Sequence, residues 1–191
     1  YPSRFRMTGQ SRTRSDLVGE LEVRTVLLTL GSNIDPEENI FKALDALDRL
    51  LGVEAVSAIY EAEPIDAPGT PKFLNAAVRI ETTLSPTVLK HEVLRPLEME
   101  LGRVRGTNPN LPRTIDIDIA AVEDLGLTDN DIGFQLPDPA ITEHAYLALP
   151  LRDAAPDFWH PTANASLDEI GQRFMKARGI LKRNDLTWPP P

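Results

Sequence analysis

The amino-acid sequence predicts an α+β domain built on an antiparallel sheet. Apolar residues recur alternately with the period of a strand and the period of a helix, in the order strand, helix, strand, strand, helix, strand. The 191 residues, 41% of them hydrophobic, suffice for one domain with its own core. This element order is that of a ferredoxin-like βαββαβ core, with helices on one face of the sheet and C-terminal helical additions after it.

The first strand and helix are predicted from a short apolar run and a helix start signal. Four of the five residues at positions 26–30 are apolar, and the run ends at Gly31-Ser32-Asn33, as expected for a buried strand. Asp35 before Pro36 is typical of an N-cap and first helical position, so a helix is predicted over residues 36–51. The apolar face of that helix holds Ile40, Leu44, Leu47, Leu50 and Leu51. Alternation over residues 53–60 then predicts the second strand.

A loop separates this half from the next. Residues 61–71 contain three prolines and a glycine, which predicts an irregular connection. Residues 73–82 predict the third strand, and Ser85-Pro86 begins a helix that runs towards Gly102. Pro96 lies inside this helix and predicts a kink or a bulge, because it removes one backbone donor.

The fourth strand is predicted at residues 114–122, where polar and apolar residues alternate strictly from Thr114 to Ile119. Two helices are predicted after it, at residues 143–155 and 166–177.

The chain divides into a domain at residues 25–180 and two terminal segments. Residues 1–24 contain arginines among Gly, Ser and Thr without apolar periodicity, which predicts a tail or linker, with a basic docking arm as the alternative. Residues 181–191 end in Trp-Pro-Pro-Pro, which cannot continue a helix or a central strand, so an extended C-terminal tail is predicted.

Composition excludes several classes of partner. The net charge of −9 argues against a broad electrostatic contact with nucleic acid or an anionic membrane, although a few local arginines suffice for a small anionic substrate. The sequence contains no cysteine, which excludes disulfides and thiolate metal sites and fits a cytoplasmic location. Because no apolar run reaches the ~18–20 residues of a membrane span, we expect no membrane partner.

A pair of carboxylates is the sharpest chemical feature. Asp116 and Asp118 alternate with isoleucines on the predicted fourth strand, so both point to one face, about 7 Å apart at the backbone. Two carboxylates on one face need a cation, and Mg²⁺ suits them because it prefers oxygen ligands. Arg103, Arg105 and Arg113 flank the pair and suit phosphate oxygens. The alternative is an amphipathic edge strand with a solvated polar face.

Two further segments fit a binding pocket. Phe73 and Asn75 share one face of the predicted third strand, where a ring and an amide suit stacking on, and hydrogen bonding to, a flat heterocycle. A core phenylalanine beside a satisfied amide is the alternative. Gly31-Ser32-Asn33 forms a tight turn between strand and helix, for which ordinary turn chemistry is the alternative role.

Together these motifs resemble one enzyme family over residues 24–160. The resemblance rests on Leu30-Gly31-Ser32-Asn33, Phe73-Leu74-Asn75-Ala76-Ala77, Glu98 before Gly102-Arg103-Val104-Arg105, and Pro112-Arg113-Thr114-Ile115-Asp116-Ile117-Asp118. They occur in the order seen in 6-hydroxymethyl-7,8-dihydropterin pyrophosphokinases of folate biosynthesis. The resemblance implies a ferredoxin-like α+β fold and transfer of the β,γ-diphosphate of ATP to the pterin hydroxymethyl group, with release of AMP.

The resemblance also implies roles for nine residues. They are Asp116 and Asp118 as ligands of two Mg²⁺ ions, Arg103 and Arg113 as catalytic residues, Glu98 and Arg105 at ATP, and Phe73, Asn75 and Tyr146 at the pterin. The expected partners are therefore ATP and a reduced pterin. We expect a monomer. Because the sequence begins at Tyr1 and with a linker-like segment, one half of a bifunctional folate enzyme is the alternative.

Among the positions that depart from the family pattern, four bear on activity. Asn110 and Leu111 replace residues of a loop before the Pro-Arg motif, Asp138 stands where a histidine is common, and His144 stands where an arginine is common. These changes leave a second hypothesis open, namely a catalytically weakened paralogue that binds nucleotide or pterin as a regulatory module.

Overall fold

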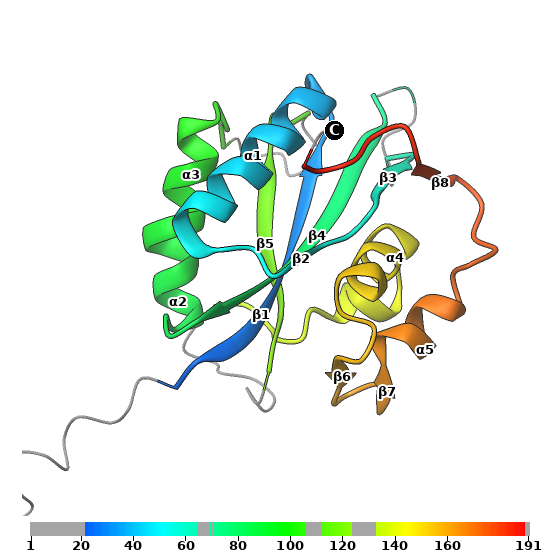
Figure 1. Ribbon diagram of the computed structural model, residues 1–191. Helices are drawn as coiled ribbons and strands as arrows, with labels where there is room; N and C mark the ends of the chain where they lie inside the picture. The colour runs from blue at the N-terminus through cyan, green and yellow to red at the C-terminus, as the bar shows by residue number, and fades with distance from the viewer. Residues whose placement is uncertain (1–21, 65–68, 70, 106–111, 124–132, 190–191) are drawn as a thin grey trace, which may run out of the picture.

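The computed structural model describes residues 22–64, 69, 71–105, 112–123 and 133–189. Figure 1 shows a sheet between two helical layers, with α1, α2 and α3 on one side and α4 and α5 on the other. Within the described residues, no helix combines the length and the apolar character that a membrane crossing requires.

The core helices and strands occur in the predicted order. The strands are β1 (Arg24–Ser32), β2 (Ala55–Val56), β3 (Ile59–Ala62), β4 (Phe73–Thr82), β5 (Asp116–Val122), β6 (Trp159–His160), β7 (Ala165–Ser166) and β8 (Ile180–Arg183). The helices are α1 (Pro36–Leu51), α2 (Pro86–Val88), the π-helix η2 (Leu89–Leu94), α3 (Arg95–Glu100), the 3-10 helix η3 (Pro139–Thr142), α4 (Ala145–Ala154) and α5 (Leu167–Gln172).

The main sheet has the strand order β5-β1-β4-β3-β8, and all its pairs are antiparallel. β2 pairs with β4 as well, so the predicted second strand is divided into β2 and β3. The four core strands are arranged as in a ferredoxin-like fold, with β1 and β4 in the centre. The predicted fold class is confirmed.

Both faces of the sheet are covered, whereas the sequence predicted helices on one face. Leu28 on β1, Val78 on β4 and Ile117 on β5 pack under α1 and under the second helical segment, which is formed by α2, η2 and α3. The opposite face presents Leu27 and Ala77 to α4 and α5. Because the side chains of a strand alternate between faces, β1 and β4 contribute to the cores on both sides of the sheet. Their near-continuous burial lacks the alternation of buried and exposed residues that one open face would produce.

The predicted bulge before Pro96 is confirmed as the π-helix η2. The Arg95 amide donates to the Lys90 carbonyl, five residues back, instead of following the four-residue spacing of an α-helix. Proline has no N–H for the preceding turn and its ring crowds the carbonyl four residues earlier, so the turn before it widens.

Two helix ends differ from the prediction. Asp35 occupies the N-cap of α1 in a left-handed conformation (φ 42°), and its side chain makes no cap hydrogen bond. Near this helix end, the side-chain amide of Asn39 donates to the Ile34 carbonyl at 2.7 Å. α5 ends at Gln172 rather than near residue 177. Beyond it the backbone bonds shorten to three-residue spacing, with the Phe174 amide donating to Gly171, so the α-helical ladder stops.

The C-terminal segment is part of the sheet, which corrects the predicted boundary at residue 180. β8 pairs with β3 over Ile180–Arg183. Further on, Trp188 packs against the core and its Nε1 donates to Asp45 Oδ1 of α1 at 2.8 Å. The free edge of β3 has backbone groups that need partners, and β8 supplies them. Of the predicted N-terminal tail, residues 1–21 lie outside the described residues.

Candidate active site

The site lies where three strands bring their polar residues into register. Gly31 on β1 stands opposite Asn75 on β4 and opposite Asp116 on β5, and Thr29 stands opposite Asp118. These residues share the sheet face on which α4 packs. The two predicted pairs, Phe73 with Asn75 and Asp116 with Asp118, therefore meet across Gly31.

Two cavities adjoin this part of the sheet. The first, of about 310 Å³, is lined by Thr29, Leu30, Gly31, Ala62, Glu63, Pro64, Phe73, Asn75, Arg113, Asp116, Asp118, Asp138, Ala140, Tyr146 and Leu147. The second, of about 720 Å³, is lined by Lys90, His91, Arg95, Arg105, Asp118, Ile119, Gly133, Phe134, Gln135, Asp138 and Pro139. Asp118 and Asp138 line both, so the two cavities meet at these carboxylates. The first cavity contains the aromatic pair Phe73 and Tyr146, and the second contains most of the cations together with Phe134.

Each carboxylate of the pair on β5 has its own cationic partner. Asp116 forms ion pairs with Arg113 and, at 3.5 Å, with Arg103. Asp118 forms an ion pair with Lys90, which sequence analysis did not identify. The sequence-based expectation that two same-face carboxylates need cations agrees with these contacts. All three cationic side chains are at most 18% exposed, so water screens these pairs only partly.

Arg113 is held in place from two directions. The Asn33 side chain accepts from the Arg113 amide at 2.7 Å, while the Asn33 amide donates to the Arg113 carbonyl at 3.1 Å. The guanidinium of Arg113 lies over the Phe73 ring, 5.6 Å from its centre. The turn at Gly31-Ser32-Asn33 thus fixes the arginine next to the carboxylate pair, a role that turn propensity alone does not predict.

Glu98 supports the site from beneath β5. It is 1% exposed and lies outside the lining of both cavities, although the family resemblance implies a role for it at ATP. Its Oε1 accepts from the Ile117 amide at 2.8 Å, and its Oε2 forms an ion pair with Arg105. Burial raises the pKa of Glu98, and the nearby Asp116 charge adds to the shift, while the hydrogen bond from Ile117 and the charge of Arg105 oppose it. Glu98 therefore positions Arg105 at the rim of the second cavity.

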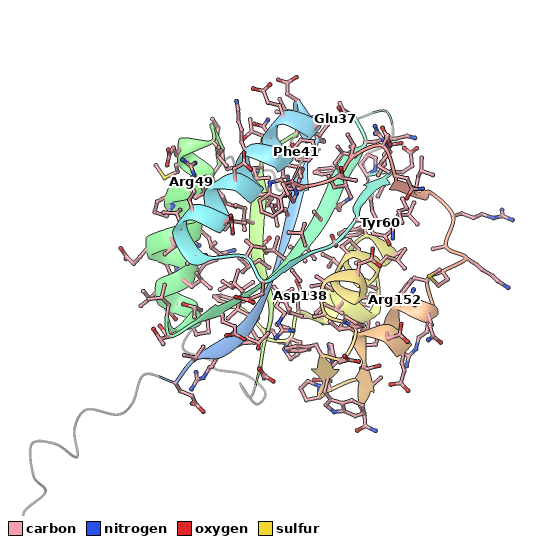
Figure 2. All side chains as sticks on the ribbon, in the orientation of Figure 1. Glu37, Phe41, Arg49, Tyr60, Asp138 and Arg152 are labelled. Carbon is pink, nitrogen blue, oxygen red and sulfur yellow. The ribbon has the colours of Figure 1, made fainter. Side chains whose placement is uncertain are left out.

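Aromatic side chains line two parts of the first cavity. Phe73 comes from the start of β4 and Tyr146 from the first turn of α4. The His144 ring stacks on Tyr146, with centres 5.3 Å apart. Burial raises the pKa of Tyr146, Asp138 raises it further and Arg113 lowers it, so the phenol is neutral at physiological pH. Tyr60, labelled in Figure 2 on β3, has its hydroxyl bonded to Asp153 of α4 at 2.9 Å, which links α4 to the sheet.

Among the four departures from the family pattern, Asp138 and His144 are described. Asp138 lies beside α4 in Figure 2 and caps η3, since its Oδ1 accepts from the Ala140 amide at 2.9 Å. One carboxylate oxygen is thus used in the fold, while the residue still lines both cavities. His144 is the N-cap residue of α4. Asn110 and Leu111 lie outside the described residues.

The arrangement fits phosphoryl transfer. A carboxylate pair with several fixed cations, between an aromatic cavity and a cationic cavity, can hold a charged polyphosphate next to a flat acceptor. Within the described residues no group of three or more His, Cys, Asp or Glu side chains is placed to hold a metal ion. A metal at this pair would therefore need further oxygens from substrate or water.

The comparisons with known proteins identify which phosphoryl-transfer family this is. Residues 27–156 match the family model of 7,8-dihydro-6-hydroxymethylpterin-pyrophosphokinase (HPPK). The chain belongs to this family, which confirms the family predicted from the sequence.

Relatives include both short and long proteins. The 2-amino-4-hydroxy-6-hydroxymethyldihydropteridine pyrophosphokinase of Pseudomonas aeruginosa is 34% identical over 142 residues, which cover 73% of this chain and 85% of that protein. The folic acid synthesis protein FOL1 of Dictyostelium discoideum is 33% identical over 146 residues, covering 76% of this chain. The chain spans only 22% of the length of that protein.

The fold is also found among solved structures. The crystal structure of wild-type Plasmodium falciparum HPPK-DHPS aligns with a TM-score of 0.60 at 14% identity, covering 80% of this chain and 45% of that one. At this identity the match supports the fold alone.

Proposed function

We propose that the chain transfers the β,γ-diphosphate of ATP to the hydroxymethyl group of 6-hydroxymethyl-7,8-dihydropterin and releases AMP. The observation that carries the proposal is the junction of the two cavities at the carboxylate pair, between aromatic residues on one side and cations on the other. Family membership supports the same reaction. ATP would occupy the second cavity and the pterin the first.

The carboxylate pair fits Mg²⁺. Asp116 and Asp118 lie on one face of β5, and both already attract cations in the structure. Two carboxylates plus phosphate oxygens and water make the ligand set that Mg²⁺ accepts, so we propose these residues as ligands of two ions bound together with ATP. When bound, the ions would lower the negative charge of the triphosphate and help to orient it.

The pterin would bind in the first cavity. We assign Phe73 and Tyr146 to its ring faces and the Asn75 amide to its hydrogen-bonding edge. Asn75 is 7% exposed, and its Nδ2 donates to the Tyr60 carbonyl at 3.5 Å. This hydrogen bond is long and therefore easily exchanged for one to a ligand. The missing side chain of Gly31 leaves space between this amide and Asp116.

The chemistry follows from charge. The pterin hydroxymethyl oxygen attacks the β-phosphorus of ATP, the bond from that phosphorus to the α,β-bridging oxygen breaks, AMP leaves with the bridging oxygen, and the hydroxyl proton goes to solvent. Negative charge grows on the bridging and equatorial oxygens, where we assign Arg103 and Arg113 as stabilising cations. Arg105, held by Glu98, would bind phosphate at the rim of the second cavity.

Release of AMP from ATP and the reduced pterin tests this proposal. D118N and D116N should each lower turnover by about 100- to 1,000-fold, because each removes a proposed metal ligand and with it the charge stabilisation that the bound ion would supply in the transition state. R103A should lose less than either aspartate variant. Full turnover in the D116N/D118N double variant would refute the proposal.

Binding without chemistry would favour the second hypothesis. A wild-type chain that binds the reduced pterin and an ATP analogue but releases no AMP is the weakened paralogue suggested by Asn110, Leu111 and Asp138. The monomeric state, the cytoplasmic location and a fused second folate activity stay predictions. Relatives such as the long Dictyostelium protein, of which the matched part is 22%, support examining the last of these.

A further inference from the structure

Lys90 contacts the site although it belongs to no motif of the sequence. Its ammonium forms an ion pair with Asp118 Oδ1 and donates to the Ile117 carbonyl at 3.4 Å. The side chain is 12% exposed, whereas that of Asp118 is 50% exposed. A nearly buried cation therefore occupies the inner side of a carboxylate whose outer side is open to the cavities.

The π-helix η2 places Lys90 there. Lys90 and Glu98 are eight residues apart and would point about 80° apart on an uninterrupted α-helix. The wide turn takes up about one extra residue, which brings the two side chains to within about 20° of one face. Both then reach the same edge of β5: Glu98 accepts from the Ile117 amide and Lys90 donates to the Ile117 carbonyl.

Lys90 also lines the second cavity, where a second partner for its ammonium would bind. It lines the cationic cavity together with His91, Arg95 and Arg105, and that cavity is where the triphosphate would lie. A lysine is a point charge on a flexible stem, so it can move from a carboxylate to a phosphate without a change of the backbone.

We propose that the Lys90 ammonium competes with metal for Asp118 and is released from it when nucleotide phosphates enter the second cavity. This inference rests on the proposed function, because it concerns the metal and the ATP of that reaction. In the empty enzyme, a metal ion must displace a charge that is already paired, which weakens its binding. With nucleotide bound, the ammonium gains phosphate oxygens as partners and Asp118 is free for the metal. Lys90 thus makes metal and nucleotide bind together.

The variant K90Q separates charge from structure. Its amide can still donate to the Ile117 carbonyl, but it carries no charge to compete at Asp118. Mn²⁺ serves as the probe for the metal and is titrated by electron paramagnetic resonance without nucleotide. We expect K90Q to bind Mn²⁺ roughly fivefold more tightly than the wild type, the size of effect that a partly exposed ion pair gives. Binding of α,β-methylene ATP without metal should weaken by a similar factor.

Controls make the outcome specific. K42Q removes a lysine that pairs with Glu38 on α1, far in sequence from the site, and should leave Mn²⁺ affinity unchanged. In a D118N background, K90Q should no longer tighten Mn²⁺ binding. If K90Q changes only the free energy of unfolding and leaves Mn²⁺ affinity at the wild-type value, the inference is overturned and Lys90 is an edge cap for β5. A tighter Mn²⁺ site in a chain that releases no AMP would refute the proposed function and leave the Lys90 inference standing.

Discussion

The sharpest prediction concerns Gly31, the glycine in the middle of the site. A methyl group added by G31A would lie 3.5 Å from Asn75 Oδ1 and 3.9 Å from Phe73 Cδ1, which are ordinary van der Waals distances. Gly31 is not among the residues with positive φ, so alanine fits its backbone. The free energy of unfolding should therefore change by no more than about 1 kcal/mol, and alanine in a strand is favoured over glycine.

Binding of the pterin should suffer much more than stability. The methyl would fill space between the Asn75 amide and the carboxylates, where the proposed pterin must lie against Phe73 and bond to Asn75. Overpacking a fitted site costs about 1–3 kcal/mol, which corresponds to roughly a 5- to 150-fold rise in Kd. The affinity for ATP should stay within about twofold, because Gly31 does not line the second cavity.

Fluorescence titration of the reduced pterin, with α,β-methylene ATP and Mg²⁺ present, measures this difference. G52A is the matched control: Gly52 has φ 71° with nothing within 4 Å of the added methyl, so that variant should lose about 1 kcal/mol of stability from strain without any loss of pterin affinity. A G31A chain of normal stability whose pterin Kd equals that of the wild type would refute the placement of the pterin in the first cavity.

Three further predictions concern the scaffold. E98A should cost about 1–3 kcal/mol in urea unfolding, because it leaves the Ile117 amide without an acceptor. E98Q keeps an acceptor and should cost less, and the reverse order would contradict the role of Glu98. Burial lowers the pKa of His160 from 6.5, so the unfolded chain takes up the proton first and stability should fall as pH drops below 6.5. H160Q should flatten urea stability measured between pH 7.5 and 5.5, and an unchanged slope would refute this. S166A removes one half of the capping box of α5 and should cost about 1 kcal/mol in thermal unfolding, with no loss if the cap is unimportant.

The carboxylate pair was predictable because it depends only on the period of a strand. Once residues 114–122 are assigned as extended, Asp116 and Asp118 must share a face, and the isoleucines between them must share the other. The structure agrees, since Ile115, Ile117 and Ile119 are all buried in the core beneath α1 and the second helical segment. Local periodicity is therefore enough to find the centre of the site.

The strand β8 and the contact of Lys90 were not predictable in the same way. β8 is four residues long with mixed burial, and it exists because β3, more than a hundred residues earlier, has an edge to pair. Lys90 reaches Asp118 only because a π-turn changes the phase of the helix. The sequence signals that change with Pro96, but the helical face that results depends on how the turn packs on β5.

The charges around the pair connect these observations. Asp116 is paired with Arg103 and Arg113, and Asp118 is paired with Lys90, so neither carboxylate is without a cation among the described contacts. A metal ion that binds here must take over from those cations, and the displaced guanidinium and ammonium groups are then attracted to the nearest anion. In the proposed reaction that anion is the triphosphate, so one exchange of partners would load the metal and bring cations to the phosphates. The net charge of −9 therefore describes the exterior, while in the proposed reaction binding at the site would be governed by this local exchange.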